Sequence, residues 1–190
     1  MLTTIAEEIM KDVSHWVGHY ENILDEAGCK SIMNYPWSWQ PSTYSNDAGI
    51  IEKSDERVRM DECWCIKEDR PYPLLKKSVI EVMNIYAQEH ERFSCIHHTD
   101  FRLNKYGISG FMSSHVDNIH HSHGQSYGYP QCSVLLFLND DYEGGELIIA
   151  DKKYETKKGS AIMFPSNFMF PHEVKEVTKG ERWSVVSWLM

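Results

Sequence analysis

Short runs typical of β-strands, separated by turn residues, fill the last ninety residues and limit the folds open to this chain. Turn signals between the runs include Asn139, the pair Gly144 and Gly145, Gly159 and Gly180. Several short strands joined by tight turns favour an antiparallel double-stranded β-helix, a barrel of the jelly-roll or cupin-like kind. The runs that predict this barrel cover residues 101–107, 133–140, 146–150, 159–165 and 182–190.

The first 99 residues have a different pattern and are predicted to be a mainly helical support region. Residues 4–35 carry apolar side chains at helical spacing, with breaks expected near Gly18 and Gly28. Residues 72–93 read as one amphipathic helix. No linker or repeat separates the two halves, so we predict a single domain over 1–190. Its class is α+β but mainly β, with N-terminal helices packed on a barrel core formed by residues 100–190.

Composition excludes some classes of partner. The formal net charge is −9, so neither nucleic acid nor an anionic membrane surface is expected as a partner. No apolar run reaches transmembrane length, and the acidic residues near the N-terminus are unlike a signal peptide. The five cysteines are an odd, scattered set, which favours reduced thiols. We therefore expect a cytoplasmic protein, whose oligomeric state stays open.

Four histidines and one aspartate crowd into "SSHVDNIHHSHGQ", residues 113–125. Side chains two apart in a strand point the same way, so His115 and Asp117 can reach one metal ion. The same His-x-Asp spacing recurs at His98, so the pair alone is weak evidence. A third ligand must come from far along the chain, and His172 is the candidate because strand pairing can bring it alongside. Two imidazoles and one carboxylate form the facial triad of non-haem Fe(II) oxygenases.

Arg182 follows ten residues after His172, where a bidentate guanidinium could hold a dicarboxylate. The segments "HVDN", "LLFLNDDYEGGEL", "KKGSAIMFPS" and "HEVKEVTKGERWSVVSW" occur in that order. Together they resemble the iron- and 2-oxoglutarate-dependent oxygenases of the prolyl hydroxylase type. The resemblance covers residues 100–190 and implies that His115, Asp117 and His172 bind iron. It also implies that Arg182 binds the distal carboxylate of 2-oxoglutarate.

Three further residues are assigned to the cosubstrate pocket. Tyr106, nine positions before the first triad histidine, matches a tyrosine that assists there in the family. Leu135 lies on a strand face that the resemblance turns toward the cosubstrate. Some relatives carry a tyrosine where Phe137 stands, and Tyr106 or Ser184 could supply the missing hydroxyl. Ser184 shares the strand face of Arg182 and could donate to the same carboxylate. Equally, Ser184 could be a small residue that only fills space under the barrel.

Four residues are candidates for contacting the substrate: Arg102, Asn118, Tyr127 and Tyr129. The side chain of Arg102 belongs to the polar face of its strand, which is predicted to line the barrel interior. The other three belong to a Gly-rich, polar connection over 118–131, and loops beside an active site often carry substrate contacts. This connection leaves three interpretations open: a solvated loop without a role, a substrate lid, or a second metal site. The histidines concerned are His120, His121 and His123.

The resemblance implies a dioxygenase that needs Fe(II), 2-oxoglutarate and O2, with ascorbate as a further candidate cofactor. Such an enzyme hydroxylates an unactivated C–H bond and releases succinate and CO2. The leading substrate is a prolyl residue of a protein or peptide. The alternatives are another amino acid, free or in protein, and a non-catalytic cupin-like metal-binding module. Arg182 separates the last alternative from the enzyme, because a plain binding module needs no anchor for a dicarboxylate.

Overall fold

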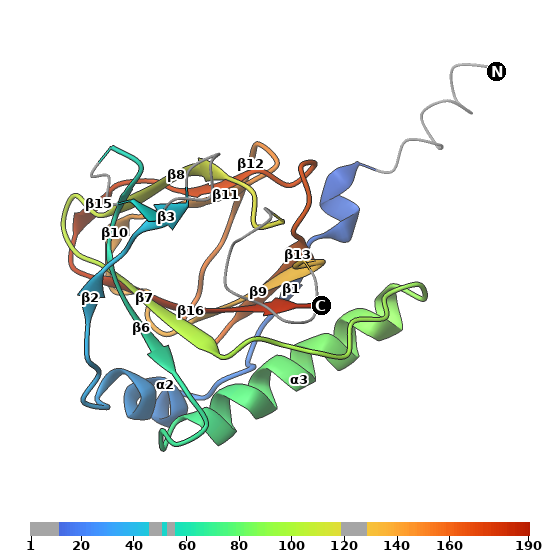
Figure 1. Cartoon of the computed structure of the whole chain (residues 1–190), viewed down its shortest axis with the longest axis horizontal. Coiled ribbons are helices and arrows are strands. Elements are labelled where there is room, and N and C mark those ends of the chain that lie inside the picture. Colours follow the sequence, from blue (N-terminus) through green and yellow to red (C-terminus); the bar gives the residue numbers. More distant parts are fainter. Residues whose placement is uncertain (1–11, 46–50, 53–55, 119–128) are drawn as a thin grey trace.

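Two antiparallel β-sheets face each other in the computed structural model, and two helices lie under the larger sheet (Figure 1). The structure describes residues 12–45, 51–52, 56–118 and 129–190. This arrangement is the double-stranded β-helix that the strand pattern predicts. The barrel interior between the sheets is where the predicted site residues would have to meet.

In the part of the chain that the structure describes, seven strands form the large sheet, in the order β1-β13-β9-β16-β7-β6-β2. The long strand β16 lies between β7 and β9, and each pairing is antiparallel. A residue on β16 therefore has neighbours on both sides. The strands are β1 (Gly18–Tyr20), β2 (Gln40–Pro41), β6 (Asp61–Cys65), β7 (Phe101–Tyr106), β9 (Cys132–Phe137), β13 (Ala161–Pro165) and β16 (Arg182–Leu189).

The small sheet has the order β12-β11-β14-β8-β5 among the described residues. Its strands are β5 (Val58–Arg59), β8 (Phe111–His115), β11 (Leu147–Ile149), β12 (Lys152–Tyr154) and β14 (His172–Val174). Two further strand pairs are short: β3 (Tyr44–Ser45) with β4 (Ile51–Glu52), and β10 (Glu143–Gly144) with β15 (Val177–Lys179). The pairing of β14 with β8 joins segments that are nearly sixty residues apart in the sequence.

Helix α3 (Tyr72–Glu89) lies along the outer face of the large sheet (Figure 1). Its buried residues include Leu75, Val79, Val82 and Tyr86, a helical spacing that gives one apolar face, as predicted. The shorter α2 (Glu26–Met33) and the 3₁₀ turn η1 (Val13–Trp16) precede it. Among the residues that the structure describes, no helix has the length and apolar character needed to span a membrane.

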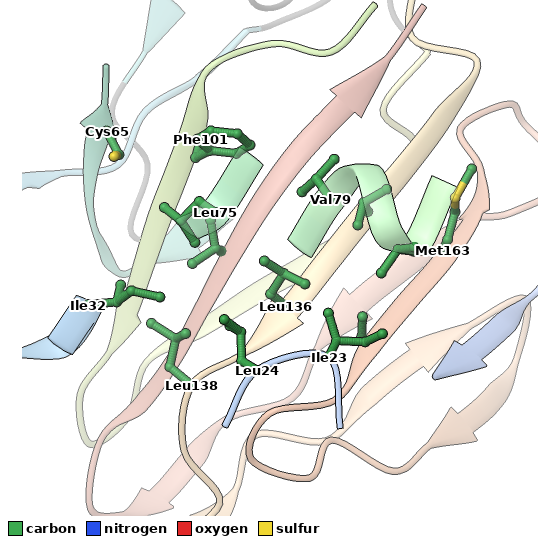
Figure 2. Packing of buried hydrophobic residues seen from close by; sticks show 14 of the residues in the cluster. Ile23, Leu24, Ile32, Cys65, Leu75, Val79, Phe101, Leu136, Leu138 and Met163 are labelled. Carbon is green, nitrogen blue, oxygen red and sulfur yellow. The ribbon is translucent and has the colours of Figure 1, made fainter. Parts of the chain in front are cut away.

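Apolar side chains pack on both faces of the large sheet. On the outer face, Leu75 and Val79 of α3 meet Phe101 and Leu136 of the strands (Figure 2). On the inner face a second cluster, which includes Phe137, fills part of the space between the sheets. Leu136 and Phe137 are adjacent and face opposite ways, as strand geometry requires. Each fully buried side chain of this kind contributes about 1.5–3 kcal/mol, so helix packing and barrel closure stabilise the same sheet.

The N-terminal part differs from the predicted pattern. Four strands from the first 99 residues, β1, β2, β5 and β6, join the two sheets, whereas the pattern predicts mainly helices there. The break expected near Gly28 is wrong, because α2 runs through this residue: its backbone N–H donates to the N-cap Asp25 at 2.7 Å. Near Gly18 the chain is extended, since β1 finds a pairing partner in β13. One domain over 1–190 stays a prediction.

Candidate metal centre and cosubstrate pocket

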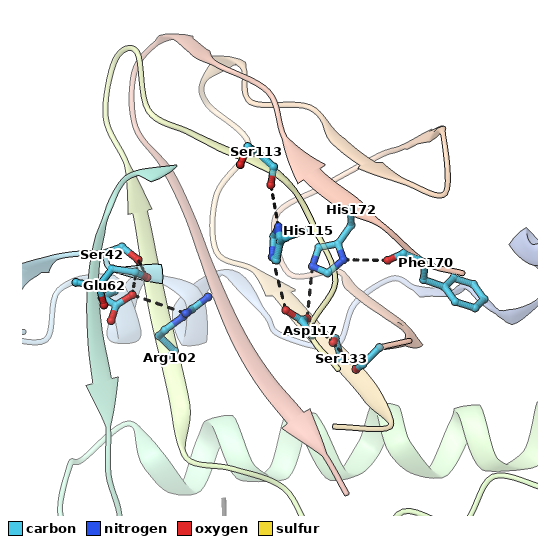
Figure 3. Close-up of polar contacts among 11 residues, drawn as sticks. Ser42, Glu62, Arg102, Ser113, His115, Asp117, Ser133, Phe170 and His172 are labelled. Carbon is cyan, nitrogen blue, oxygen red and sulfur yellow. Dashed lines mark hydrogen bonds and ion pairs between the residues drawn. The ribbon is translucent and has the colours of Figure 1, made fainter. Parts of the chain in front are cut away.

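His115, Asp117 and His172 meet in the barrel interior (Figure 3). His172 of β14 is the register partner of His115 of β8, so strand pairing sets the two imidazoles side by side. Asp117 follows two residues after His115, just past the end of β8. One ligand atom from each residue lies within 4.8 Å of the others. The Nε2 atoms of His115 and His172 are 3.6 and 3.4 Å from the Asp117 carboxylate.

Hydrogen bonds orient each of the three side chains. The Nδ1 atoms of His115 and His172 lie 2.9 and 3.1 Å from the carbonyl oxygens of Ser113 and Phe170. A carbonyl can only accept, so each Nδ1 carries the proton and each Nε2 keeps its lone pair for a metal. On the other side, Ser133 Oγ donates to Asp117 at 2.6 Å. This donor set, two imidazoles and one carboxylate on the same side, fits Fe(II).

Burial and mutual contact shift the pKa values of the three groups. Burial, reinforced by His172, lowers the pKa of His115 to about 4, so this imidazole is neutral at pH 7. Burial alone would raise the pKa of Asp117, but the two imidazoles and Ser133 hold it well below its usual value. Burial opposes a charge on His172, yet the Asp117 carboxylate raises its pKa. A metal cation bound at His172 Nε2 would satisfy the same carboxylate.

Arg182 is buried in the same cavity, and no anionic partner for it lies among the described residues. It begins β16, opposite Tyr106 of β7, and is 1% exposed. Its guanidinium carbon lies 5.2 Å from the ring centroid of Tyr106 and 5.5 Å from that of Phe137. Nη1 donates to Ser184 Oγ at 3.2 Å, but Nε has no hydrogen-bond partner among the described residues. A buried cation left in this state is costly, so the cavity favours an anion beside it.

The Gly-Gly and Leu-Asn-Asp segments position Arg182. Gly145 has φ +64°, and a Cβ on it would lie 3.0 Å from the Cδ atom of Arg182. Only glycine combines this backbone conformation with so close an approach. Asn139 fixes the start of β16, because its Oδ1 accepts from the Trp183 N–H at 2.8 Å and its Nδ2 donates to the Glu181 carbonyl at 2.7 Å.

The remaining predicted pocket residues lie where strand parity places them. Tyr106, Leu135, Ser184 and Arg102 line one cavity together with the triad and Arg182. Burial raises the pKa of Tyr106 despite the nearby arginines, so its phenol remains a hydrogen-bond donor at neutral pH. Phe137 packs under Arg182 and leaves the hydroxyl contacts to Tyr106 and Ser184. Their roles toward a cosubstrate stay predictions.

The candidate substrate loop is described only at its two ends. Asn118 is exposed, and its Nδ2 donates to the Pro130 carbonyl at 2.8 Å. Tyr129 is 56% exposed. Tyr127 and the three histidines at 120, 121 and 123 lie outside the described residues. The second His-x-Asp pair lies elsewhere: His98 bonds to the Thr99 carbonyl and stacks on Phe101, as expected for a structural residue.

Residues 101–190 match the model of the 2OG-Fe(II) oxygenase superfamily. This segment contains the triad, Tyr106 and Arg182. Residues 101–190 belong to the 2OG-Fe(II) oxygenase superfamily. The oxygenase segment therefore begins at β7 and includes every strand that carries a predicted site residue.

Curated relatives match only part of the chain. A PKHD-type hydroxylase of Rippkaea orientalis is 39% identical over 100 residues, which cover 50% of this chain and 43% of that protein. Human prolyl 3-hydroxylase 2 is 41% identical over 70 residues, or 33% of this chain and 10% of that protein. The chain thus spans less than half the length of these relatives.

The fold is shared with prolyl hydroxylases of known structure. A prolyl hydroxylase of Trichoplax adhaerens, solved with a peptide fragment of a hypoxia inducible factor oxygen degradation domain, has a TM-score of 0.70. The match covers 93% of this chain and 84% of that one at 14% identity. An identity this low supports the double-stranded β-helix alone. The fold likeness covers most of the N-terminal part that the family match omits.

The sequence pattern does not indicate that two residues, Ser133 and Glu62, contact predicted site residues. Ser133 lies on the same strand as Leu135, but no local pattern reveals its contact with Asp117, because this contact joins β9 to the end of β8. Glu62 of β6 lies 3.7 Å from Arg102. The run "DECWC" does not alternate polar with apolar residues, and its partner strand lies forty residues further along the chain.

Proposed function

We propose that this protein is an Fe(II)- and 2-oxoglutarate-dependent dioxygenase that hydroxylates an unactivated C–H bond. The observation that carries the proposal is one cavity with two features. A His-Asp-His cluster lies on one wall, and an arginine without an anionic partner among the described residues lies on another. The first suits a divalent metal and the second a carboxylate. A cosubstrate with two carboxylates can satisfy both.

Each residue has a definite task in this proposal. His115, Asp117 and His172 hold the metal, and the carbonyls of Ser113 and Phe170 keep the imidazoles in the required tautomer. Arg182 binds the distal carboxylate of 2-oxoglutarate, with Ser184 as a second donor. Tyr106 donates from its phenol, and Leu135 closes the apolar side of the pocket. These positions orient the cosubstrate before reaction.

The chemistry itself belongs to the bound group. When bound, Fe(II) with O2 lets 2-oxoglutarate lose CO2 and become succinate, while a substrate C–H becomes C–OH. The side chains contribute burial: Asp117, His172, Arg182 and Ser184 are each less than a tenth exposed. Exclusion of water strengthens the electrostatic contacts inside the cavity and protects the reacting atoms. No side chain is needed as a general base.

A prolyl residue of a protein or peptide is the leading substrate in this proposal. Support comes from relatives named as hydroxylases, prolyl 3-hydroxylase 2 among them, and from a fold neighbour solved with a peptide. Arg102, Asn118 and Tyr129, with Tyr127 outside the described residues, are the proposed substrate contacts. We also propose a reducing, cytoplasmic setting, which the five buried free thiols support.

An anaerobic titration tests the proposal directly. The purified protein, loaded with Fe(II), should develop a metal-to-ligand charge-transfer absorption when 2-oxoglutarate is added. Admission of O2 should then produce succinate, with ascorbate tested as an additional reductant. The His172→Ala variant should lose the absorption, whereas His98→Ala, altered at the other His-x-Asp pair, should keep it. Fe(II) binding without any 2-oxoglutarate response would favour the metal-binding module instead.

A further inference from the structure

A second arginine lines the cavity that contains the triad and Arg182. Arg102 lies on β7 opposite Val186 of β16, whereas Arg182 lies opposite Tyr106, four positions further along β7. Four residues of a strand span about 13 Å, so the two arginines start from well-separated points of the wall. The two guanidinium groups are therefore separate charges on one wall, and each could pair with an anion of its own.

The guanidinium of Arg102 is oriented by its neighbours and keeps a donor free. Its central carbon lies 4.9 Å from the ring centroid of Trp188. Its Nη1 lies 3.7 Å from Glu62 Oε2, within ion-pair range but too long for a hydrogen bond. Its buried Nε has no acceptor among the residues that the structure describes. Arg102 is thus an oriented donor without an assigned acceptor.

Glu62 explains this orientation without occupying the free donor. It lies on β6 opposite Asn104 and is 8% exposed. Ser42 Oγ donates to its Oε2 at 2.6 Å, which holds the carboxylate in place (Figure 3). Glu62 does not line the cavity, whereas Arg102 does. The acid therefore balances part of the charge of Arg102 and leaves Nε for a ligand.

Apolar side chains also line the cavity that contains Arg102. Val186, Trp188, Leu135 and Met112 line the same cavity. A ligand that fits here presents an anionic oxygen pair to Arg102 and hydrocarbon to these side chains. A carboxylate next to an aliphatic chain or ring has this chemistry, and it can accept two N–H bonds from one guanidinium.

We propose that Arg102 binds a free carboxylate of the substrate. The hydroxylated unit is then an amino acid in its free form or the C-terminal residue of a peptide. This inference rests on the proposed dioxygenase function and narrows its substrate class. An internal peptide residue offers only a neutral carbonyl at this position, which leaves the charge of Arg102 without its match.

Matched pairs of acids and amides provide the test. The probes are the twenty standard L-amino acids and the tripeptides Gly-Gly-X, each as the free acid and as the amide. Binding to the anaerobic protein with Fe(II) and 2-oxoglutarate is measured by calorimetry. At least one acid should bind tenfold or more tightly than its amide. Arg102→Gln should reduce that ratio to below threefold, while Arg59→Gln, an exposed arginine of β5, should preserve it.

Three outcomes overturn the inference. In the first, acids and amides bind with affinities within threefold of each other, or neither binds. In the second, Arg102→Gln keeps the preference for the acid. In the third, Arg102→Gln weakens the binding of 2-oxoglutarate as much as the binding of the acid. The last outcome would make Arg102 a cosubstrate anchor. If Arg102→Gln does not fold, Arg102→Lys is measured instead. Lysine keeps the charge but not the bidentate geometry of the guanidinium, so the acid-to-amide ratio should fall several-fold. An unchanged ratio in Arg102→Lys refutes the inference.

Failure of this inference is distinguishable from failure of the proposed function. If wild-type protein does not bind Fe(II) and 2-oxoglutarate, the dioxygenase proposal itself fails. If both bind and succinate forms, but no probe shows a preference for the acid, only the role of Arg102 is refuted. Free amino acids and Gly-Gly-X acids further separate the two sources of a carboxylate. Glu62→Gln is a further control. If the ion pair between Arg102 and Glu62 were purely structural, this substitution would change the stability of the protein without changing the acid-to-amide ratio.

Discussion

Replacement of Arg182 by alanine should strongly weaken 2-oxoglutarate binding while leaving the metal site intact. Arg182 touches none of the three triad residues through a hydrogen bond or ion pair among the described residues, so iron affinity should change little. The guanidinium is 1% exposed, with Nε free of a partner among those residues. The cosubstrate carboxylate would thus lose a buried, charged partner and retain only the hydroxyls of Ser184 and Tyr106.

The size of the effect follows from that burial. Truncating one partner of a buried, hydrogen-bonded charge pair costs about 2–5 kcal/mol. At about 1.4 kcal/mol per tenfold, the dissociation constant for 2-oxoglutarate should rise from about 30-fold to about 4,000-fold. Added at one hundred times its wild-type dissociation constant, 2-oxoglutarate stabilises the native protein by about 2.7 kcal/mol. A variant with hundredfold weaker binding would gain only about 0.4 kcal/mol at that concentration.

Thermal unfolding under anaerobic conditions with Fe(II) measures this difference. For a chain of this size, about 2.7 kcal/mol corresponds to a rise in Tm of about 5–11 °C, and about 0.4 kcal/mol to about 1 °C. Arg182→Lys should recover part of the rise, because an ammonium cannot reproduce the bidentate fork. Arg59→Ala on β5 is the matched control and should show the full rise. A full rise in Arg182→Ala would refute the assignment of the carboxylate anchor.

Other substitutions probe the remaining parts of the site. Alanine at any triad position should abolish turnover and lower Fe(II) affinity sharply by calorimetry, whereas His98→Ala should retain it. Ser133→Ala should weaken Fe(II) binding about 10- to 100-fold, because Asp117 loses its orienting donor; unchanged affinity would show that the bond is dispensable. Gly145→Ala should raise the 2-oxoglutarate KM several-fold with Fe(II) binding preserved, since its Cβ displaces Arg182. Tyr129→Ala should impair peptide hydroxylation but spare 2-oxoglutarate turnover without substrate; equal loss of both would place it in the cosubstrate pocket.

Much of the barrel follows from local sequence pattern. Strand runs such as residues 101–107 and 182–190 contain β7 and β16, and α3 begins and buries one face as its apolar spacing predicts. These elements are predictable because their side chains alternate or recur with the period of the structure they form. Strand parity also places Tyr106 and Arg102 correctly on the cavity wall.

Features that depend on distant partners were not predictable in the same way. β1 forms because β13 offers an edge, and its three residues carry no strand pattern of their own. Glu62 is a buried acid whose meaning appears only beside Arg102. Asp117 lies beyond the end of β8, so parity along a strand is only part of the reason that it meets the histidines. The bond from Ser133 supplies the rest.

The two sheets divide the proposed site between them. The triad histidines belong to the small sheet, whereas Arg182, Tyr106 and Ser133 belong to the large one. The Ser133–Asp117 hydrogen bond links the end of β8 to β9 across the interior. Neither sheet alone presents both a metal cluster and a carboxylate anchor, so metal and cosubstrate can bind together only after the sheets have packed. Ligands that bind only the packed state stabilise it. The ordered set of short motifs along residues 100–190 is therefore more informative than any one of them, because each motif contributes residues to a different wall of the same cavity.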